Sequence, residues 1–160
     1  MLKIFNLMDV FFEDTYREVS VREYAKLKKM SPPTASKALR DLEKEGLLLS
    51  QERGIYLFFR ANREHYLFRS FTRAYWQDKM HRALKGVQEE ALNRKMVLFG
   101  SLVKAENTLA SDADVFVDLP YRKLDTKKAE ASLRRPIQLH FQDSLKNPSL
   151  KESIGKGVEI

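Results

Sequence analysis

Two aspartates at alternate positions, Asp112 and Asp114, constrain the fold of this 160-residue chain more than any other feature. They lead into a β-prone run, residues 115–117, and the side chains of residues i and i+2 lie on one face of an extended segment. Both carboxylates therefore point the same way, while Ala113 and Val115 point the opposite way, toward a core. Adjacent carboxylates repel each other unless a cation lies between them, and oxygen ligands suit Mg²⁺ or Mn²⁺.

An apolar run before the aspartates, residues 96–99, predicts a buried strand that stops at Gly100-Ser101. Gly100 lets the backbone approach a ligand closely, and the start of a helix offers free N–H groups to phosphate. With the two aspartates, these residues predict a site for a metal-bound nucleoside triphosphate. The alternative interpretation is a surface hairpin with two solvated aspartates.

This order of a strand, Gly-Ser, a polar connection and Asp-x-Asp on the next strand resembles the minimal nucleotidyltransferases of the DNA polymerase β superfamily. The resemblance implies Mg²⁺- or Mn²⁺-dependent transfer of a nucleotidyl group from a nucleoside triphosphate to a protein or small-molecule acceptor. It implies that Asp112 and Asp114 bind the metal. The residues that match the nucleotide-binding part of the motif are Gly100, Ser101 and Lys104.

The resemblance is incomplete at the third carboxylate, which in this superfamily stands on a later strand and helps to activate the acceptor. The polar face of the predicted strand over residues 136–142 carries Gln138, His140 and Gln142 instead. Asp143 lies just past that strand and is the candidate substitute. Many relatives also have a glycine at the position of Ala105. The alternative function is therefore a non-enzymatic transcriptional regulator with a degenerate nucleotide-sensing or partner-docking domain.

Residues 20–60 carry a second pattern. Ser20 and Ser31 are predicted helix N-caps, the second followed by proline. The helix after Ser31 places apolar residues at helical spacing, and Gly46 is predicted to end it. Two strands follow, residues 47–50 and 55–59, around a turn at residues 51–54 in which Gly54 takes a positive φ.

This order resembles the winged helix-turn-helix domains of bacterial and archaeal regulators, whose second helix enters the major groove of double-stranded DNA. The resemblance implies base contacts near the start of that helix and phosphate contacts farther along it and at the hairpin tip. The alternative is a solvated basic face on a dimerisation or docking module. The residues implied in base contacts are Pro33, Thr34, Ser36 and Lys37, and those implied in phosphate contacts are Arg40, Lys44 and Arg53.

The rest of the chain sets the organisation. Residues 1–12 predict an apolar helix that is covered by the chain's own core or by a second subunit of a homodimer. Lys3 and Asp9 interrupt that apolar start, so we expect no membrane span and a cytoplasmic location. The net charge of +7 permits nucleic-acid binding, and the absence of cysteine excludes a thiolate zinc site.

The sequence therefore predicts an α+β protein of three parts. The expected parts are a winged helix-turn-helix domain over residues 1–61, a linker helix over residues 62–84 and a minimal nucleotidyltransferase domain with a small mixed sheet over residues 85–160.

Overall fold

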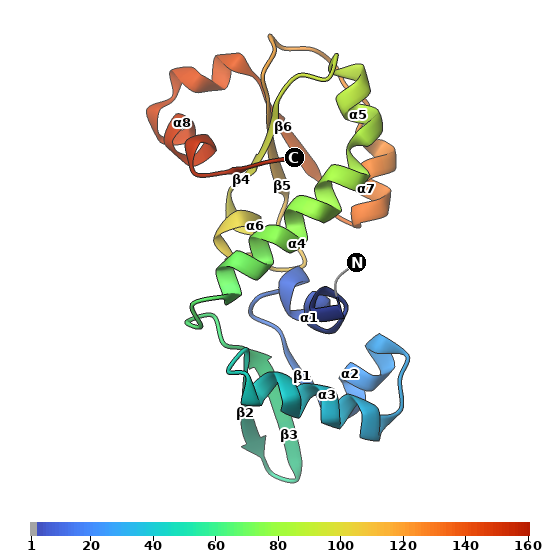
Figure 1. Ribbon diagram of the computed structural model, residues 1–160. Helices are drawn as coiled ribbons and strands as arrows, with labels where there is room; N and C mark the ends of the chain where they lie inside the picture. The colour runs from blue at the N-terminus through green and yellow to red at the C-terminus, as the bar shows by residue number, and fades with distance from the viewer. Residues whose placement is uncertain (1–2) are drawn as a thin grey trace. The chain divides into compact units, whose positions relative to one another are not determined.

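The computed structural model describes residues 3–160, which divide into two compact units on either side of the Phe71–Thr72 bond. Both units combine helices with a small sheet, so the predicted α+β class is confirmed (Figure 1). The expected helix over residues 1–12 is α1, Lys3–Glu13, and the first two expected positions lie outside the described residues. Among residues 3–160, no helix is both long and apolar enough to cross a lipid bilayer.

The N-terminal unit has a three-stranded antiparallel sheet in the order β1-β3-β2. Its core is rich in aromatic side chains, with Phe11, Tyr24 and Phe59 fully buried. The elements after α1 are β1 (Glu18–Ser20), α2 (Val21–Lys28), α3 (Pro32–Lys44), β2 (Leu48–Arg53) and β3 (Tyr56–Ala61).

The two predicted N-caps are confirmed. The Ser20 hydroxyl accepts a hydrogen bond from the Glu23 amide at 3.2 Å, and the Ser31 hydroxyl accepts one from the Thr34 amide at 3.3 Å. These bonds satisfy backbone donors that have no partner within the helix. One face of α3 is buried through Ala35, Leu39 and Leu42, as the helical spacing predicts.

The predicted turn of the hairpin is wrong by several residues. The strands pair as far as Arg53 and Tyr56, so the turn is the two-residue step Gly54-Ile55 and not residues 51–54. Gly54 has a φ of 62°, as predicted, and tight hairpin turns require such positive values. The turn therefore fixes the register, and the polar residues 51–53 join the ladder because both faces of the hairpin tip are exposed.

The predicted linker helix starts too early. Residues 62–67 form turns, and α4 runs from Phe68 to Ala83. Asn62 explains the delay, because its amide nitrogen donates to the Gly46 carbonyl at 2.8 Å and its backbone N–H donates to the Leu47 carbonyl. These bonds hold the chain against the end of α3 before a helix can begin.

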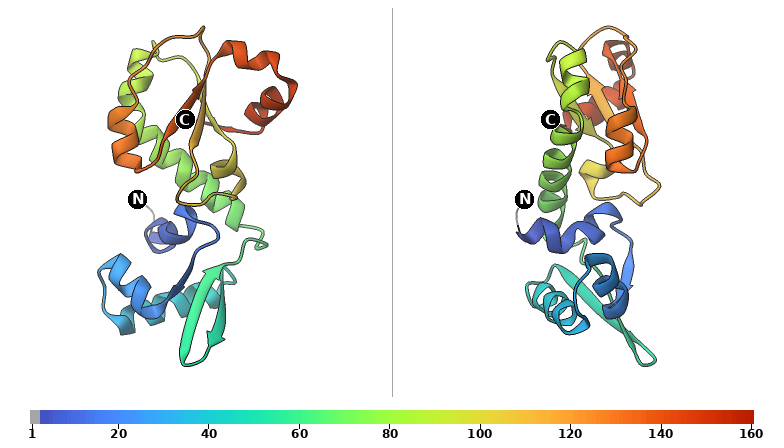
Figure 2. Two further views of the ribbon diagram at one scale, coloured as in Figure 1. Left: turned by 180° about the vertical axis from the view of Figure 1, so that it is seen from behind. Right: turned by 90° about the vertical axis from the view of Figure 1, so that its right-hand side faces the viewer.

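The C-terminal unit is built on a four-stranded mixed sheet in the order β6-β5-β4-β7. β5 and β6 are parallel, and the other two pairs are antiparallel. In both opposite views, α8 lies on one side of the sheet and α5 and α7 lie on the other (Figures 1 and 2). The elements after α4 are α5 (Lys85–Glu90), β4 (Met96–Phe99), α6 (Ser101–Lys104), β5 (Ala113–Val117), α7 (Lys127–Leu133), β6 (Ile137–His140), the 3₁₀ helix η1 (Gln142–Lys146), α8 (Pro148–Gly155) and β7 (Val158–Glu159).

Candidate functional site

Gly100 and Asp114 lie together at one end of the four-stranded sheet. The antiparallel pairing of β4 and β5 sets Phe99 opposite Asp114, so Gly100 follows at the point where β4 ends. Gly100 has φ 79° and ψ −150°, a conformation that L-residues avoid. A Cβ atom at this position would be 2.5 Å from Oδ2 of Asp114. Glycine is therefore required here both by the backbone and by the carboxylate beside it.

The two aspartates are exposed to different degrees. Asp112 is exposed and precedes β5, whereas Asp114 lies within the strand and is half-buried. Ala113 and Val115 are fully buried, as the alternation predicts. The opposite face of this segment therefore carries both carboxylates.

The neighbouring strand places two polar side chains beside Asp114. The parallel register sets Gln138 opposite Asp114 and His140 opposite Phe116. Nε2 of His140 lies 3.1 Å from Oδ1 of Asp114, and the His140 ring packs edge-on against Phe99 at a centroid distance of 5.0 Å. Gln138, a neutral amide, therefore lies beside Asp114 on the strand where a third carboxylate is expected and absent.

Asp143 is not brought to this end of the sheet. β6 ends at His140, and the chain turns into η1, where Asp143 pairs with Lys146 at 2.9 Å. The adjacent residue Gln142 donates its backbone N–H to the Leu119 carbonyl, beyond the far end of β5. Asp143 thus lies past the opposite end of the strand from Asp114. Within residues 3–160, no group of three His, Asp or Glu side chains is arranged to hold a metal ion.

The other expected nucleotide-binding residues lie on α6. Ser101 is half-buried at its first position and Lys104 is exposed at its last. Ala105 ends the helix in the left-handed conformation, with φ 58° and ψ 44°, and donates its N–H to the Ser101 carbonyl. The hydrogen bond from Lys156 and, to a smaller extent, the charge of Lys104 lower the pKa of Glu152 on α8.

The residues expected to contact DNA lie on α3 and the hairpin. All of them are exposed except Ser36, which is partly buried. Lys37 pairs with Asp41 at 2.7 Å, and its ammonium group lowers the pKa of that carboxyl. Arg40 lies 3.4 Å from a Glu43 oxygen, and Arg53 pairs with a carboxylate of β1. Three of the expected cations are therefore already partnered by acidic side chains in this unit.

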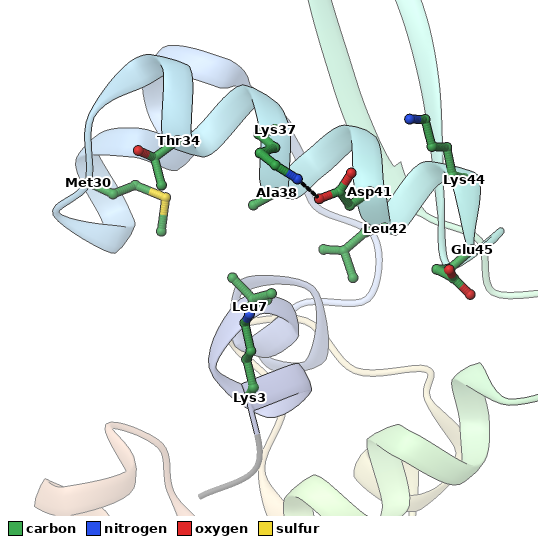
Figure 3. A pocket seen from close by; sticks show the side chains of 10 residues that line it. All are labelled: Lys3, Leu7, Met30, Thr34, Lys37, Ala38, Asp41, Leu42, Lys44 and Glu45. Carbon is green, nitrogen blue, oxygen red and sulfur yellow. Dashed lines mark hydrogen bonds and ion pairs between the residues drawn. The ribbon is translucent and has the colours of Figure 1, made fainter.

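Sequence reasoning missed a groove between α1 and α3. The groove has a volume of about 550 Å³ and its helices face each other through apolar and charged side chains (Figure 3). Its position could not be read from either helix alone, because it depends on how the two helices pack. The residues that line it are Lys3, Leu7, Met30, Thr34, Lys37, Ala38, Asp41, Leu42, Lys44 and Glu45.

A family model described as a nucleotidyltransferase domain matches residues 80–158. This interval contains the strand β4, the Gly100-Ser101 turn and both aspartates. Searches of curated proteins and of solved structures gave no match. The matched family supports a nucleotidyltransferase module in the C-terminal unit, and the match does not extend to the elements from α1 to β3.

Proposed function

We propose that the C-terminal unit transfers a nucleotidyl group from a nucleoside triphosphate to a protein or small-molecule acceptor, with Mg²⁺ or Mn²⁺ bound. The observation that carries the proposal is the contact between Gly100 and Asp114. It places a carboxylate oxygen against a half-buried turn of backbone immediately after a buried strand, inside the region matched by the nucleotidyltransferase family.

The donor set fits this chemistry. Asp112 and Asp114 offer hard oxygen ligands on one face, of the kind that Mg²⁺ and Mn²⁺ prefer. When bound, the cation neutralises the triphosphate and lowers the pKa of an attacking hydroxyl. The Gly100-Ser101 backbone and the Lys104 ammonium are then the groups of this chain that bind the phosphates, and the absence of a Cβ at Gly100 leaves room for the Asp114 carboxylate beside them.

Calorimetry with a non-hydrolysable nucleoside triphosphate tests the site. The wild type should bind the nucleotide only with Mg²⁺ or Mn²⁺, and the double substitution Asp112→Asn/Asp114→Asn should abolish binding because it removes both anionic ligands. Asp143→Asn is the matched control, since it removes a carboxylate at the other end of β6. Equal binding by the wild type and the double variant would exclude the site.

Gln138 favours a second function, that of a nucleotide sensor without turnover. It lies directly opposite Asp114, and a neutral amide neither accepts the acceptor's proton nor replaces an anionic ligand. If the unit is a sensor, the wild type binds labelled nucleotide but transfers little, and Gln138→Asp transfers the same amount or more. Strong wild-type transfer that is lost in Asp143→Asn would overturn this, because Asp143 would then act as the third carboxylate.

For the N-terminal unit, the proposed role is binding to double-stranded DNA as a winged helix-turn-helix domain of a transcription regulator. The support is the element order α2, α3 and hairpin, together with the exposed cations Lys37, Arg40 and Lys44 on α3. Binding to duplex DNA should weaken steeply as salt is raised, because phosphate contacts release counterions. No binding to any duplex at low salt would favour a docking module instead.

A further inference from the structure

The hydrogen bond between His140 and Asp114 has no part in binding the metal or the phosphates at the proposed site. Both side chains are largely shielded from solvent, with exposed fractions of 15% for His140 and 26% for Asp114. His140 pairs with Phe116, which lies farther along β5 than Asp114. The contact is therefore on the sheet itself and not at the end where Gly100 lies. The edge-on contact with Phe99 fixes the plane of the imidazole ring.

The chemistry of the pair assigns the hydrogen. An ionised carboxylate only accepts hydrogen bonds, so Nε2 of His140 must carry the hydrogen that joins it to Oδ1 of Asp114. The other oxygen, Oδ2, lies against Gly100, where a Cβ would be 2.5 Å away. Asp114 is therefore held from two sides, by the imidazole on one oxygen and by the bare backbone of the turn beside the other.

We propose that His140 is a positioning residue that fixes the rotation of the Asp114 carboxylate so that Oδ2 is presented at the Gly100 turn. The proposal rests on the proposed metal–nucleotide site. Side chains that orient a ligand through a second hydrogen bond contribute to binding without touching the metal, and their loss typically weakens metal affinity about 10- to 100-fold. Gln138, on the same strand, has no equivalent contact to Asp114 among those seen in residues 3–160.

The test compares two substitutions of His140. His140→Leu keeps most of the volume and removes the donor, whereas His140→Gln retains an N–H donor on a side chain of similar reach. In calorimetry with Mn²⁺ and a non-hydrolysable nucleoside triphosphate, His140→Leu should lose affinity about 10- to 100-fold and His140→Gln should recover most of it. The affinity of Mn²⁺ alone, measured by electron paramagnetic resonance, should follow the same order.

His81 provides the matched control, because it is an exposed histidine on α4. His81→Leu and His81→Gln should both bind like the wild type. If His140→Leu binds as tightly as the wild type while Asp114→Asn does not bind, the positioning role is overturned and the proposed site stands. If the wild type itself does not bind the metal with the nucleotide, both the site and the positioning role are overturned.

A measurement on the folded wild type remains decisive if His140→Leu does not fold. In ¹⁵N NMR of the imidazole, Nε2 of His140 should carry the hydrogen, and its resonance should shift in Asp114→Asn and stay unchanged in His81→Gln. An Nε2 without hydrogen, or a resonance indifferent to Asp114→Asn, would show that the hydrogen bond is absent and would overturn the proposal.

Discussion

Asp114 in the C-terminal unit and Lys37 in the N-terminal unit are both central to a proposed function, but their surroundings differ. Asp114 is 26% exposed and contacts a histidine that is 15% exposed. Lys37 is 78% exposed, and its partner Asp41 is 52% exposed. An exposed pair of this kind is screened by solvent, contributes little to stability and separates readily when a ligand competes for one member. Changes near Asp114 should therefore abolish function, whereas changes near Lys37 should adjust it.

The largest effect is expected for Gly100→Ala. Alanine would have to adopt φ 79° and ψ −150°, which costs about 1–3 kcal/mol, and its Cβ would lie 2.5 Å from Oδ2 of Asp114. We expect the carboxylate to be displaced and metal–nucleotide binding to be undetectable by calorimetry. Urea unfolding should show a free energy of unfolding lower by a similar amount.

Gly54→Ala separates backbone strain from displacement of the carboxylate. Gly54 also has a positive φ, 62°, but a Cβ there would meet nothing within 4 Å. This variant should lose only about 1 kcal/mol of stability and bind nucleotide like the wild type. Normal nucleotide binding by Gly100→Ala would contradict the view that the fold holds Asp114 in one place.

Tyr24 provides the second prediction, because it is a buried polar group in the unit whose functional charges are exposed. Its hydroxyl donates to the Leu7 carbonyl at 2.7 Å, and burial, with a smaller effect of Asp9, raises its pKa well above the ordinary value near 10. At a pH above 10 but below the raised pKa, the tyrosine of the unfolded chain has released its proton and that of the folded unit retains it. Stability should therefore fall by about 1.4 kcal/mol per pH unit.

The difference between the wild type and Tyr24→Phe isolates this effect from other groups that titrate in alkali. Hydrogen exchange of the α1 and α2 amides should show the excess loss of stability in the wild type and not in Tyr24→Phe. DNA affinity at neutral pH should be the same in both, since Tyr24 is buried away from the exposed face of α3. A parallel alkaline loss in both proteins would mean that Tyr24 ionises in the folded state.

Substitutions on α3 should give smaller and opposite effects. Arg40→Ala should weaken binding to all duplexes about equally and make the salt dependence shallower by about one unit, because one phosphate contact is lost. Asp41→Asn should strengthen binding, because it removes a negative charge from the face and releases Lys37 from its ion pair. Each change should be about threefold to tenfold when followed by fluorescence anisotropy at low salt.

The informative result on α3 is whether the two variants change DNA affinity in opposite directions. If Arg40→Ala and Asp41→Asn weaken binding equally, the ion pairs are structural supports and α3 is not the contact surface. If neither variant changes binding, DNA contacts lie elsewhere on the unit, and the basic face of α3 is a solvated or docking surface.

Local patterns in the sequence were sufficient to predict the strands and the helix on which the proposed binding residues lie. The four-residue apolar run of β4 ends at a glycine, and alternation around Asp114 separates the buried from the polar face. On α3, the serine cap and the spacing of Ala35 and Leu39 predicted both the start of the helix and its buried face. Each of these signals arises from residues that are neighbours in the chain.

Features that depend on distant pairing could not be predicted. The contact of His140 with Asp114 needs the register of β5 with β6, and the remote position of Asp143 follows from where β6 ends. β7 consists of two residues paired with β4 at the edge of the sheet, so no local pattern marks it as a strand. The delayed start of α4 depends on the bond from the Asn62 side chain to the Gly46 carbonyl, which joins the segment to α3.

The smallest effect is expected at Ala105, where the backbone conformation at the end of α6 is unfavourable for a residue with a Cβ atom. Ala105 is buried and holds φ 58°, the left-handed region that costs a residue with a Cβ about 1 kcal/mol. Ala105→Gly should remove that cost and, after the added flexibility of the unfolded chain is subtracted, raise the free energy of unfolding by up to about 0.6 kcal/mol. Ala110→Gly is the control, because Ala110 is exposed and does not have a positive φ. It should lower stability by about 0.4–1 kcal/mol in the same urea titration. A loss of stability in both variants would mean that the methyl group of Ala105 contributes more to packing than its backbone conformation costs.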